Sequence, residues 1–450
     1  MPPSDTLEQT VVENDIKFLT PFIVDLNGVL RGKRLPSTQL NKVVKKGIRM
    51  PLSAANVDIW GKDIDDSPLV FQSGDVDGKC IWTEQTPLLM SWNESHSLML
   101  PMSYFNEDGS PFMGDSRNIL RSVLQKFAAM SLRVVLGFEL EFYLTNPNET
   151  DAKVINPLTG TARNHDGVLS IDDINDYTKF LDDVCRCCEL NNIDLDAISS
   201  ESGMSQFEIN LRHTDDILRI TDSVIFLKNI IKFIARQHGF AATFMAKPFS
   251  SRPGSGMHAH FSLLDAKSKN ILDDGSEEGS SVMRNCVGGM IRHMRQSALI
   301  FAPHLNSYRR LAPNQHAPIK LNWGYENRTA ALRIPGGEKI SRRIEHRVAG
   351  ADTNAYLVAA AILGAALVGI KNQIEAPTHT IGDSSVFVRE EDTLPTTWLE
   401  AINCLKNGDL IGGTINELAL DMILRTKKQE YATFTSDISQ FEYKSYLEAV

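Results

Sequence analysis

The chain has 450 residues, of which 42% are hydrophobic, and its formal net charge is -10 at pH 7. This length accommodates two or three domains with sizeable cores, and the acidic balance argues against a nucleic-acid partner. Six cysteines in so long a chain are too sparse for a disulfide framework and favour a reducing compartment.

Neither the N-terminal residues nor the long apolar run of the sequence indicates a membrane protein. Residues 1–18 are acidic and polar and lack the apolar segment of a signal peptide. The long apolar run at residues 356–370 is rich in alanine and shorter than the ~20 residues that a membrane span requires. We therefore expect this run to be a buried helix, and we expect a cytoplasmic protein without a membrane partner.

The pattern of predicted elements changes near residue 111. Residues 16–106 alternate short apolar runs with turn signals and predict a small β-rich domain after a tail at residues 1–15. Within it, Asn27 and Gly28 predict a hairpin turn. From residue 111 to residue 450, longer helical patterns alternate with strands and indicate a larger domain. We expect helices at 116–131, 173–190, 215–238 and 279–300, a strand at 134–143, and surface loops at 145–170 and 264–281.

Polar side chains recur at i, i+2 spacing in four segments, which places them on one face of a strand. For Glu139 and Glu141 alone, a half-exposed strand with a solvated acidic side is an equally good interpretation. The pattern returns in three later segments, which contain Gln206, Glu208, Asn210 and Arg212; His258 and His260; and Arg343, Glu345 and Arg347. Before the histidines, Gly254 and Gly256 predict a turn with φ > 0 that approaches a ligand closely.

If these strands join one sheet, five carboxylates and one imidazole converge: Glu139, Glu141, Glu201, Glu208, Glu345 and His258. So many like charges cannot stay ionised together unless cations offset their repulsion. A donor set dominated by carboxylate oxygen favours Mg²⁺ or Mn²⁺ over zinc, and we expect two or three ions. Pairs of such ions usually serve phosphoryl chemistry, in which they bridge phosphate oxygens.

Seven arginines follow between residues 309 and 347: Arg309, Arg310, Arg328, Arg333, Arg342, Arg343 and Arg347. Guanidinium groups bind carboxylates and phosphates in a bidentate manner. A solvated basic face is the alternative, but Arg328 and Arg333 stand in the apolar context NRTAALRIP, where burial without a partner is unfavourable. The segment therefore predicts a local anion site.

Together these motifs resemble the glutamine synthetase family in order and spacing. They are the ExE of Glu139 and Glu141, the ExGxxQxE of residues 201–208, KP followed by GSGMHxH, NSYRR at 306–310, NRTAALRIP and RRIEHR, and the match runs from about Gly137 to Leu357. The resemblance implies an α+β fold with a small N-terminal β-grasp domain and a large catalytic domain, in which helices surround an antiparallel sheet funnel. It also implies a homo-oligomer, a dodecamer of two stacked hexameric rings.

The resemblance further implies an ATP-dependent reaction, in which the γ-carboxylate of L-glutamate is phosphorylated and an amine then displaces phosphate. One metal ion beside glutamate would be held by Glu141, Glu201 and Glu208, and another at the ATP phosphates by Glu139, His258 and Glu345. Glutamate would meet Arg310, Arg347 and the backbone near Gly254. ATP would lie by His260, Ser262, Arg333 and Arg343, and Arg328 would stabilise the transferred phosphoryl group.

Departures from the ammonia-using members of the family indicate a different amine. Those members carry a glutamate in a PGxEAP loop and an aspartate in a DGSS-like loop, whereas this chain has His316 in the first and Ser53 followed by two alanines in the second. Both carboxylates that would hold ammonium are missing, and Pro253 replaces an asparagine. We expect a primary amine such as putrescine or an alkylamine, in a pocket that Trp60 and Lys320 help to shape.

His316 completes the candidate catalytic set with Arg328 and Glu208. It either acts as a base near neutral pH or only lines its loop. Three other functions stay open: a glutamine synthetase that uses ammonia, a guanidino kinase of the same fold, and a catalytically silent regulatory or structural relative. The silent relative is disfavoured because every metal position is filled.

Overall fold

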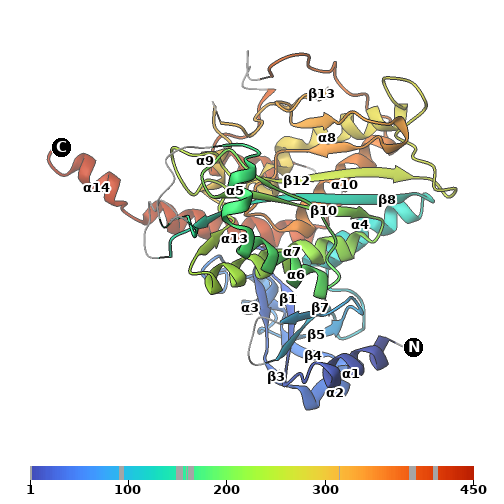
Figure 1. Cartoon of the computed structure of the whole chain (residues 1–450), viewed down its shortest axis with the longest axis vertical. Coiled ribbons are helices and arrows are strands. Elements are labelled where there is room, and N and C mark those ends of the chain that lie inside the picture. The colour runs from blue at the N-terminus through green and yellow to red at the C-terminus, as the bar shows by residue number, and fades with distance from the viewer. Residues whose placement is uncertain are drawn as a thin grey trace.

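The computed structural model describes residues 3–90, 96–147, 156–158, 160, 167–313, 315–384, 392–408 and 414–450. Within these ranges the chain forms two sheets with helices around them. Figure 1 shows the small N-terminal sheet in blue below the larger sheet, whose strands run from teal to orange. The predicted α+β architecture, with a small β-rich unit followed by a larger sheet and its helices, is confirmed.

The N-terminal sheet has the strand order β2-β1-β7-β5-β4, with β3 paired to β1 and β6 paired to β7. Its elements are α1 (Pro3–Glu13), β1 (Phe18–Val24), β2 (Leu30–Gly32), β3 (Leu35–Pro36), α2 (Leu40–Lys46), β4 (Ile48–Pro51), α3 (Pro68–Phe71), β5 (Asp77–Trp82), β6 (Leu88–Met90) and β7 (Ser97–Phe105). β1 and β2 form the predicted antiparallel hairpin, and Gly28 in its turn has a φ of 78°. Helix α1 lies inside the segment that we predicted as a tail.

The larger sheet has the order β13-β14-β15-β12-β8-β10-β9, and β11 pairs with β8. Its strands are β8 (Arg133–Thr145), β9 (Leu195–Ser200), β10 (Gln206–Thr214), β11 (Ala241–Thr243), β12 (Met257–Leu264), β13 (Trp323–Tyr325), β14 (Leu332–Ile334) and β15 (Ile344–His346). These pairings are antiparallel except that of β13 with β14. On β8, the side chains of Phe138, Leu140 and Phe142 are buried in the core, so the intervening glutamates share the opposite face.

The helices of the larger part of the chain are α4 (Ser116–Ala128), α5 (Ile171–Asp176), α6 (Thr178–Leu190), α7 (Ile217–Gln237), α8 (Ser281–Phe301), α9 (Ser307–Arg310), α10 (Ala355–Lys371), α11 (Trp398–Asn407), α13 (Glu417–Ser436) and α14 (Gln440–Tyr446), of which α14 does not pack on the sheet. The helix predicted at 173–190 is divided at Tyr177 into α5 and α6. The side chains of Asp115, Asp216, Ser280 and Asn354 accept hydrogen bonds from free N–H groups of the first turn, which explains where α4, α7, α8 and α10 begin.

Helix α10 is the apolar run at 356–370, and it is buried as expected. Glycines let it approach α8 closely, because Gly289 lies against the carbonyl of Ala365 and Gly369 against that of Asn285, where a Cβ would collide. Among the described residues, no helix has the length and apolar character needed to cross a bilayer.

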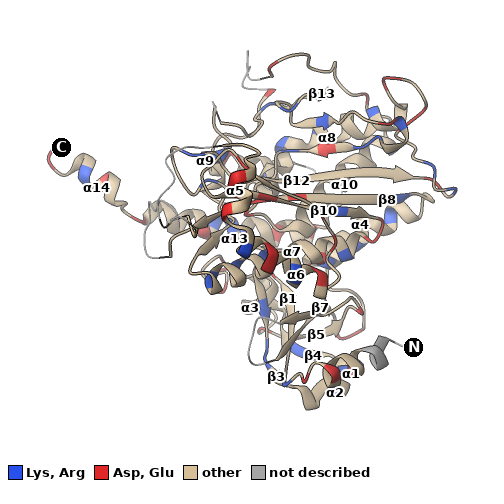
Figure 2. Ribbon diagram, viewed as in Figure 1, with Lys and Arg blue, Asp and Glu red and all other residues tan. Residues whose placement is uncertain are grey.

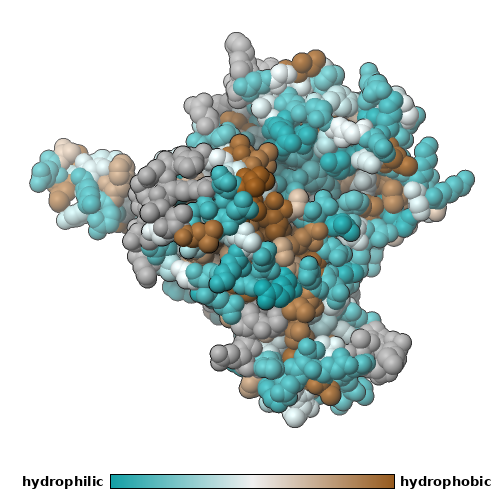
Figure 3. Space-filling view, in the orientation of Figure 1, coloured by the Kyte–Doolittle hydropathy of each residue, from teal (hydrophilic) through white to brown (hydrophobic). Residues whose placement is uncertain are grey.

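Helix α13 contacts two loops of the N-terminal unit, the β1–β2 turn and the loop that contains Ile59. Buried Glu430 accepts hydrogen bonds from Asn27 Nδ2 at 2.9 Å and from the Ile59 backbone N–H at 2.8 Å. Trp60, in the same loop, packs on Phe434 with ring centroids 5.2 Å apart. Beyond α13, helix α14 projects from the body (Figures 1 and 3), and its exposed apolar residues are Phe441, Tyr443, Tyr446 and the following Leu447.

Candidate active site

The carboxylates of β8 and β10 meet on one face of the larger sheet. Glu208 on β10 lies directly opposite Glu141 on β8, and Asn210 lies opposite Glu139. Glu201 follows the end of β9, and its backbone N–H donates to the carbonyl of Gln206 at 2.9 Å. Figure 2 shows acidic positions in red on these central strands. The structure therefore brings together carboxylates from three segments that are separated in sequence.

The neighbouring strands add two histidines and a further glutamate. On β12, His258 lies opposite Glu139, and His260 lies opposite Glu345 of β15. The distance from His258 Nδ1 to Glu139 Oε2 is 3.0 Å, and that from His260 Nε2 to Glu139 Oε1 is 2.9 Å. Glu139 thus lies between both imidazoles.

Two groups have ligand atoms close enough to share an ion. The ligand atoms of Glu139, Glu208 and His258 lie within 4.8 Å of one another, and so do those of Glu139, His260 and Glu345. This grouping differs from the expected one, in which His258 accompanied Glu139 and Glu345 and His260 belonged to the nucleotide. His258 Nδ1 still lies 4.0 Å from Glu345 Oε1. The pleated register of β12 and β15 explains the difference, because it places His260 directly beside Glu345.

The electrostatics of the cluster favour bound cations. Burial, together with repulsion from Glu139, Glu141 and Glu201, raises the pKa of Glu208 to about 9. Burial and Glu141 raise the pKa of Glu201 to about 7. Burial acts against ionised Glu139 as well, but the hydrogen bond from His258 and the close contact with His260 hold its pKa below the usual range. Without a cation, Glu208 keeps its proton at neutral pH, and a divalent ion would replace that proton.

The donor chemistry fits Mg²⁺ or Mn²⁺. Carboxylate oxygens dominate both groups, and each group contains one imidazole. His260 Nδ1 is buried and accepts or donates no hydrogen bond within the described residues, so this ring is not held by a neighbour on that side. Glu141 and Glu201 lie outside both groups of close ligand atoms, although their charges act on Glu208.

The loop that precedes β12 and contains Gly254 and Gly256, which we call the glycine loop, packs tightly against Arg310. We predicted φ > 0 at Gly254 and Gly256, and this prediction is wrong, because neither is among the residues with positive φ. The close approach exists for another reason. A Cβ on Gly254 would lie 2.8 Å from Arg310 Cγ, and a Cβ on Gly256 would lie 2.7 Å from Arg310 Nη2 and 3.4 Å from Glu141 Oε1. Glycine is needed here to leave space for a guanidinium beside a carboxylate.

Arg310 is 6% exposed, and its Nη1 donates to the carbonyl of Val348 at 2.6 Å. Arg347 pairs with Glu345 and is half-buried. Burial would raise the pKa of Glu345, but the adjacent Arg347 and the two histidines hold that pKa below its usual range. Both arginines that we assigned to glutamate binding therefore lie at the carboxylate cluster.

The remaining candidate residues differ in their surroundings. Arg333 Nη1 bonds to Glu345 Oε2 at 2.9 Å, as expected for a partnered buried arginine. Arg328 is exposed, so the expectation of burial from its apolar context is wrong, although its charge acts on Glu201. Ser262 is half-buried on β12, two residues beyond His260 and on the same face. His316 is exposed.

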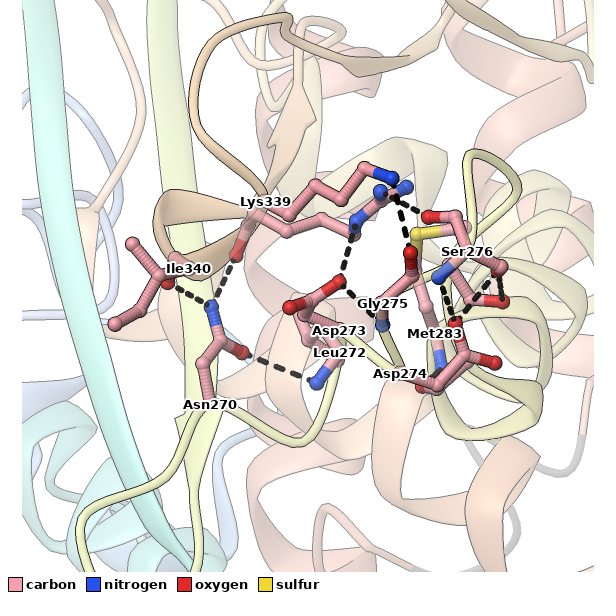
Figure 4. Close-up of polar contacts among 12 residues, drawn as sticks. Asn270, Leu272, Asp273, Asp274, Gly275, Ser276, Met283, Lys339 and Ile340 are labelled. Carbon is pink, nitrogen blue, oxygen red and sulfur yellow. Dashed lines mark hydrogen bonds and ion pairs between the residues drawn. The ribbon is translucent and has the colours of Figure 1, made fainter.

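Arg342 and Arg343 are adjacent but have separate environments. Figure 4 shows the polar contacts of the loop that Arg342 contacts, among them the hydrogen bond from Asn270 to the carbonyl of Ile340. Buried Arg342 donates to the carbonyls of Ser276 at 2.8 Å and Glu277 at 3.0 Å, and Asn270 Nδ2 donates to the Arg342 carbonyl at 2.7 Å. Arg342 thereby fixes the 270–279 loop. Arg343 is half-buried and precedes β15, where it shares a strand face with Glu345.

Sequence reasoning gave no role to Gln206 and did not single out Tyr143. Gln206, which is 2% exposed, donates through Nε2 to Glu141 Oε2 at 3.2 Å and to the carbonyl of Gly254 at 3.0 Å. The Tyr143 hydroxyl donates to the carbonyl of Pro253 at 2.9 Å. Gln206 already stood in the i, i+2 pattern of its strand without a role, and extending the pattern of Glu139 and Glu141 by one step would have reached Tyr143.

Comparisons with known proteins agree with this geometry. A family model described as glutamine synthetase, catalytic domain, matches residues 113–446. γ-Glutamylputrescine synthetase of Escherichia coli strain K12 is 35% identical over 390 residues, which cover 84% of this chain and 80% of that protein. A glutamine synthetase of Pyrococcus horikoshii is 30% identical over 442 residues, which cover 96% and 91%. The solved structure of a GmaS complex with ADP has a TM-score of 0.86 and 27% identity, and the match covers 98% of this chain and 99% of that chain.

Proposed function

Because the chain belongs to the glutamine synthetase family, we propose that it is an ATP-dependent ligase that joins the γ-carboxylate of L-glutamate to a primary amine. The products are a γ-glutamyl amide, ADP and phosphate. The similarity to γ-glutamylputrescine synthetase and to an ADP complex supports this proposal. A carboxylate does not react with an amine until one of its oxygens becomes part of a leaving group, and phosphorylation supplies that leaving group.

Two groups of side chains would hold divalent ions, Mg²⁺ or Mn²⁺, with room for a third through Glu141 and Glu201. The first group is Glu139, Glu208 and His258, and the second is Glu139, His260 and Glu345. Ions at these positions would supply positive charge that neutralises phosphate oxygens during phosphoryl transfer. In this assignment Glu208 is a metal ligand that must lose its proton before it binds.

Arginines would orient the two substrates for the first step. Arg310 and Arg347, with the backbone at Gly254, bind glutamate, and Arg333 and Arg343 bind the ATP phosphates together with Ser262. A γ-carboxylate oxygen attacks the γ-phosphorus, the bond to the bridging oxygen of ADP breaks, and γ-glutamyl phosphate forms. Arg328 is exposed, and its guanidinium, which can bind two phosphate oxygens at once, would stabilise the transferred phosphoryl group.

In the second step the neutral amine attacks the carbonyl carbon, and phosphate leaves with the electrons of the C–O bond. The nitrogen loses one proton, and His316 is our candidate to accept it. We infer an organic amine such as putrescine or an alkylamine because His316 stands in place of the glutamate of the PGxEAP loop, and the segment with Ser53 followed by two alanines lacks the aspartate of the DGSS-like loop. Trp60 and Lys320 are the further candidates for that pocket.

One observation carries the proposal. A Cβ on Gly256 would lie within 3.4 Å of both Arg310 and Glu141. A guanidinium that can bind an anion and a carboxylate that can bind a metal ion therefore lie on either side of the same glycine. This juxtaposition suits an amino-acid substrate beside a metal ion. A two-metal phosphatase would not require an arginine that binds an amino-acid carboxylate at this position.

The test is phosphate release with ATP, glutamate and Mg²⁺ across ammonium, monoamines, diamines and polyamines, with the amide identified by mass spectrometry. We expect turnover with an organic amine and little with ammonium. Turnover with ammonium and with no organic amine would identify a glutamine synthetase. That function is the second candidate because of the similarity to the Pyrococcus horikoshii enzyme. No turnover with any amine would indicate a silent relative. The proposed dodecamer is tested separately by measuring the mass of the particle in solution.

A further inference from the structure

Lys247 lies where three segments of the candidate site meet. Its side chain is 7% exposed, which is unusual for lysine unless the ammonium is hydrogen-bonded. The Nζ atom donates to the carbonyl of Arg252 and, at 2.6 Å, to Oε1 of Gln315. Lys247 therefore connects the glycine loop to the loop that follows α9.

The backbone of Lys247 is fixed independently of its side chain. Its N–H donates to Asn306 Oδ1 at 2.9 Å, and Asn306 Nδ2 donates to the Lys247 carbonyl at 2.9 Å. Asn306 immediately precedes α9, which carries Arg310. The backbone of Lys247 is therefore held beside the start of α9 independently of the bond from its ammonium to Gln315.

Gln315 is the neighbour of His316, and the two side chains have different surroundings. Gln315 is half-buried on Lys247, whereas His316 is exposed. A backbone hydrogen bond from Gln315 N–H to the Ala312 carbonyl at 3.2 Å closes the turn. If the Gln315 side chain were released, the loop could rotate, and the direction of His316 would change with it.

We propose that Lys247 is a positioning residue that holds the segment of Gln315 and His316 against the 248–254 loop and, through Gln315, determines how the amine reaches the site. This inference rests on the proposed function, because it assigns the segment of Gln315 and His316 to the amine. The competing possibility is that Lys247 only supports the glycine loop through the Arg252 carbonyl. Substitution of Gln315 separates the two, since it removes one bond and leaves the other.

The experiment compares Gln315→Met, Lys247→Met and the double variant with two controls, Gln9→Met and Lys406→Met, which change exposed residues on α1 and α11. We expect Gln315→Met to raise the KM for the amine about tenfold, the effect of one lost hydrogen bond to a charged group. The KM values for glutamate and ATP should stay within about twofold. The double variant should match Lys247→Met, because both substitutions break the same link.

Hydrogen exchange of the peptide covering residues 311–321 gives a readout that does not depend on activity. We expect faster exchange in Gln315→Met and Lys247→Met than in the wild type and the controls. An unchanged amine KM and unchanged exchange in Gln315→Met would overturn the inference, even if Lys247→Met fails to fold. If the wild type turns over no amine, the proposed function fails, while exchange still decides whether the link holds the loop.

Discussion

Glu141 and Glu208 face each other across the antiparallel pair β8 and β10. Two like charges opposite each other destabilise a sheet. Here the result is that burial and neighbouring carboxylates raise the pKa of Glu208 to about 9. This arrangement is unfavourable for folding and favourable for binding a divalent ion.

The stabilisation by Mg²⁺ should increase with pH. The folded-state pKa of Glu208 lies above the ordinary glutamate value of 4.5, so the metal-free protein loses stability as pH rises from about 4.5 towards 9. Mg²⁺ binds the ionised carboxylate and offsets that loss. We expect the Mg²⁺-dependent rise in Tm, measured by scanning calorimetry, to be larger at pH 8.5 than at pH 6. In Glu208→Gln the pH dependence should become weaker, and an equal rise at both pH values in the wild type would contradict the assignment.

Gln206→Leu should impair glutamate use more than ATP use. The substitution removes the donor to Glu141 and to the Gly254 carbonyl while leaving the side chain apolar and similar in size. Because a small displacement of an aligned substrate can reduce rate by about 10²-fold, we expect kcat/KM for glutamate to fall by about that factor. Gln206→Glu should be worse, since it adds a carboxylate beside Glu141. A loss confined to the KM for ATP would refute this role.

Gly256→Ala should displace Arg310. The added Cβ would lie 2.7 Å from Nη2 and cannot be accommodated without a shift. We expect a loss of stability of about 1–3 kcal/mol, together with a raised KM for glutamate. Gly167→Ala is the matched control, because its Cβ would meet neighbours at an ordinary distance of 3.4 Å. Urea unfolding and steady-state kinetics measure the two effects, and similar results for both variants would exclude a special role for Gly256.

Asp222→Asn should strongly destabilise the helical layer. Arg117 and Asp222 form an ion pair at 3.0 Å with side chains 4% and 3% exposed, and the Tyr356 hydroxyl bonds to the same carboxylate. Removing the charge of Asp222 leaves a buried guanidinium without its partner, which costs about 3–5 kcal/mol. Asp421→Asn breaks a partly exposed pair with Arg425 and should cost about 0.5 kcal/mol or less. Equal midpoints in urea would show that the buried pair contributes no more than the exposed one.

The alternation of side chains on strands was enough to predict the acidic face from sequence. Glu139, Glu141 and Glu208 lie where i, i+2 spacing placed them, because the period of a strand is fixed by its backbone. The helices at 116–131, 215–238 and 279–300 were also found, since their caps and apolar periodicity are local signals.

What sequence could not supply is the register between strands distant in the chain. The pairing of His260 with Glu345 joins segments 85 positions apart, and no local pattern specifies it. For the same reason the link from Lys247 to Gln315 was not foreseen. The apolar residues around Arg328 in the sequence led us to expect that it is buried. Arg328 lies in a turn and is exposed, so the apolar character of its sequence neighbours did not predict its burial.

Glu139 belongs to both groups of potential ligands. An ion that draws on one of its oxygens changes the charge available to an ion at the other position, so the two occupancies are thermodynamically linked. Such linkage is reciprocal, and whatever the first ion does to the affinity of the second, the second does equally to the first. A titration would therefore show one coupled isotherm in place of two independent ones.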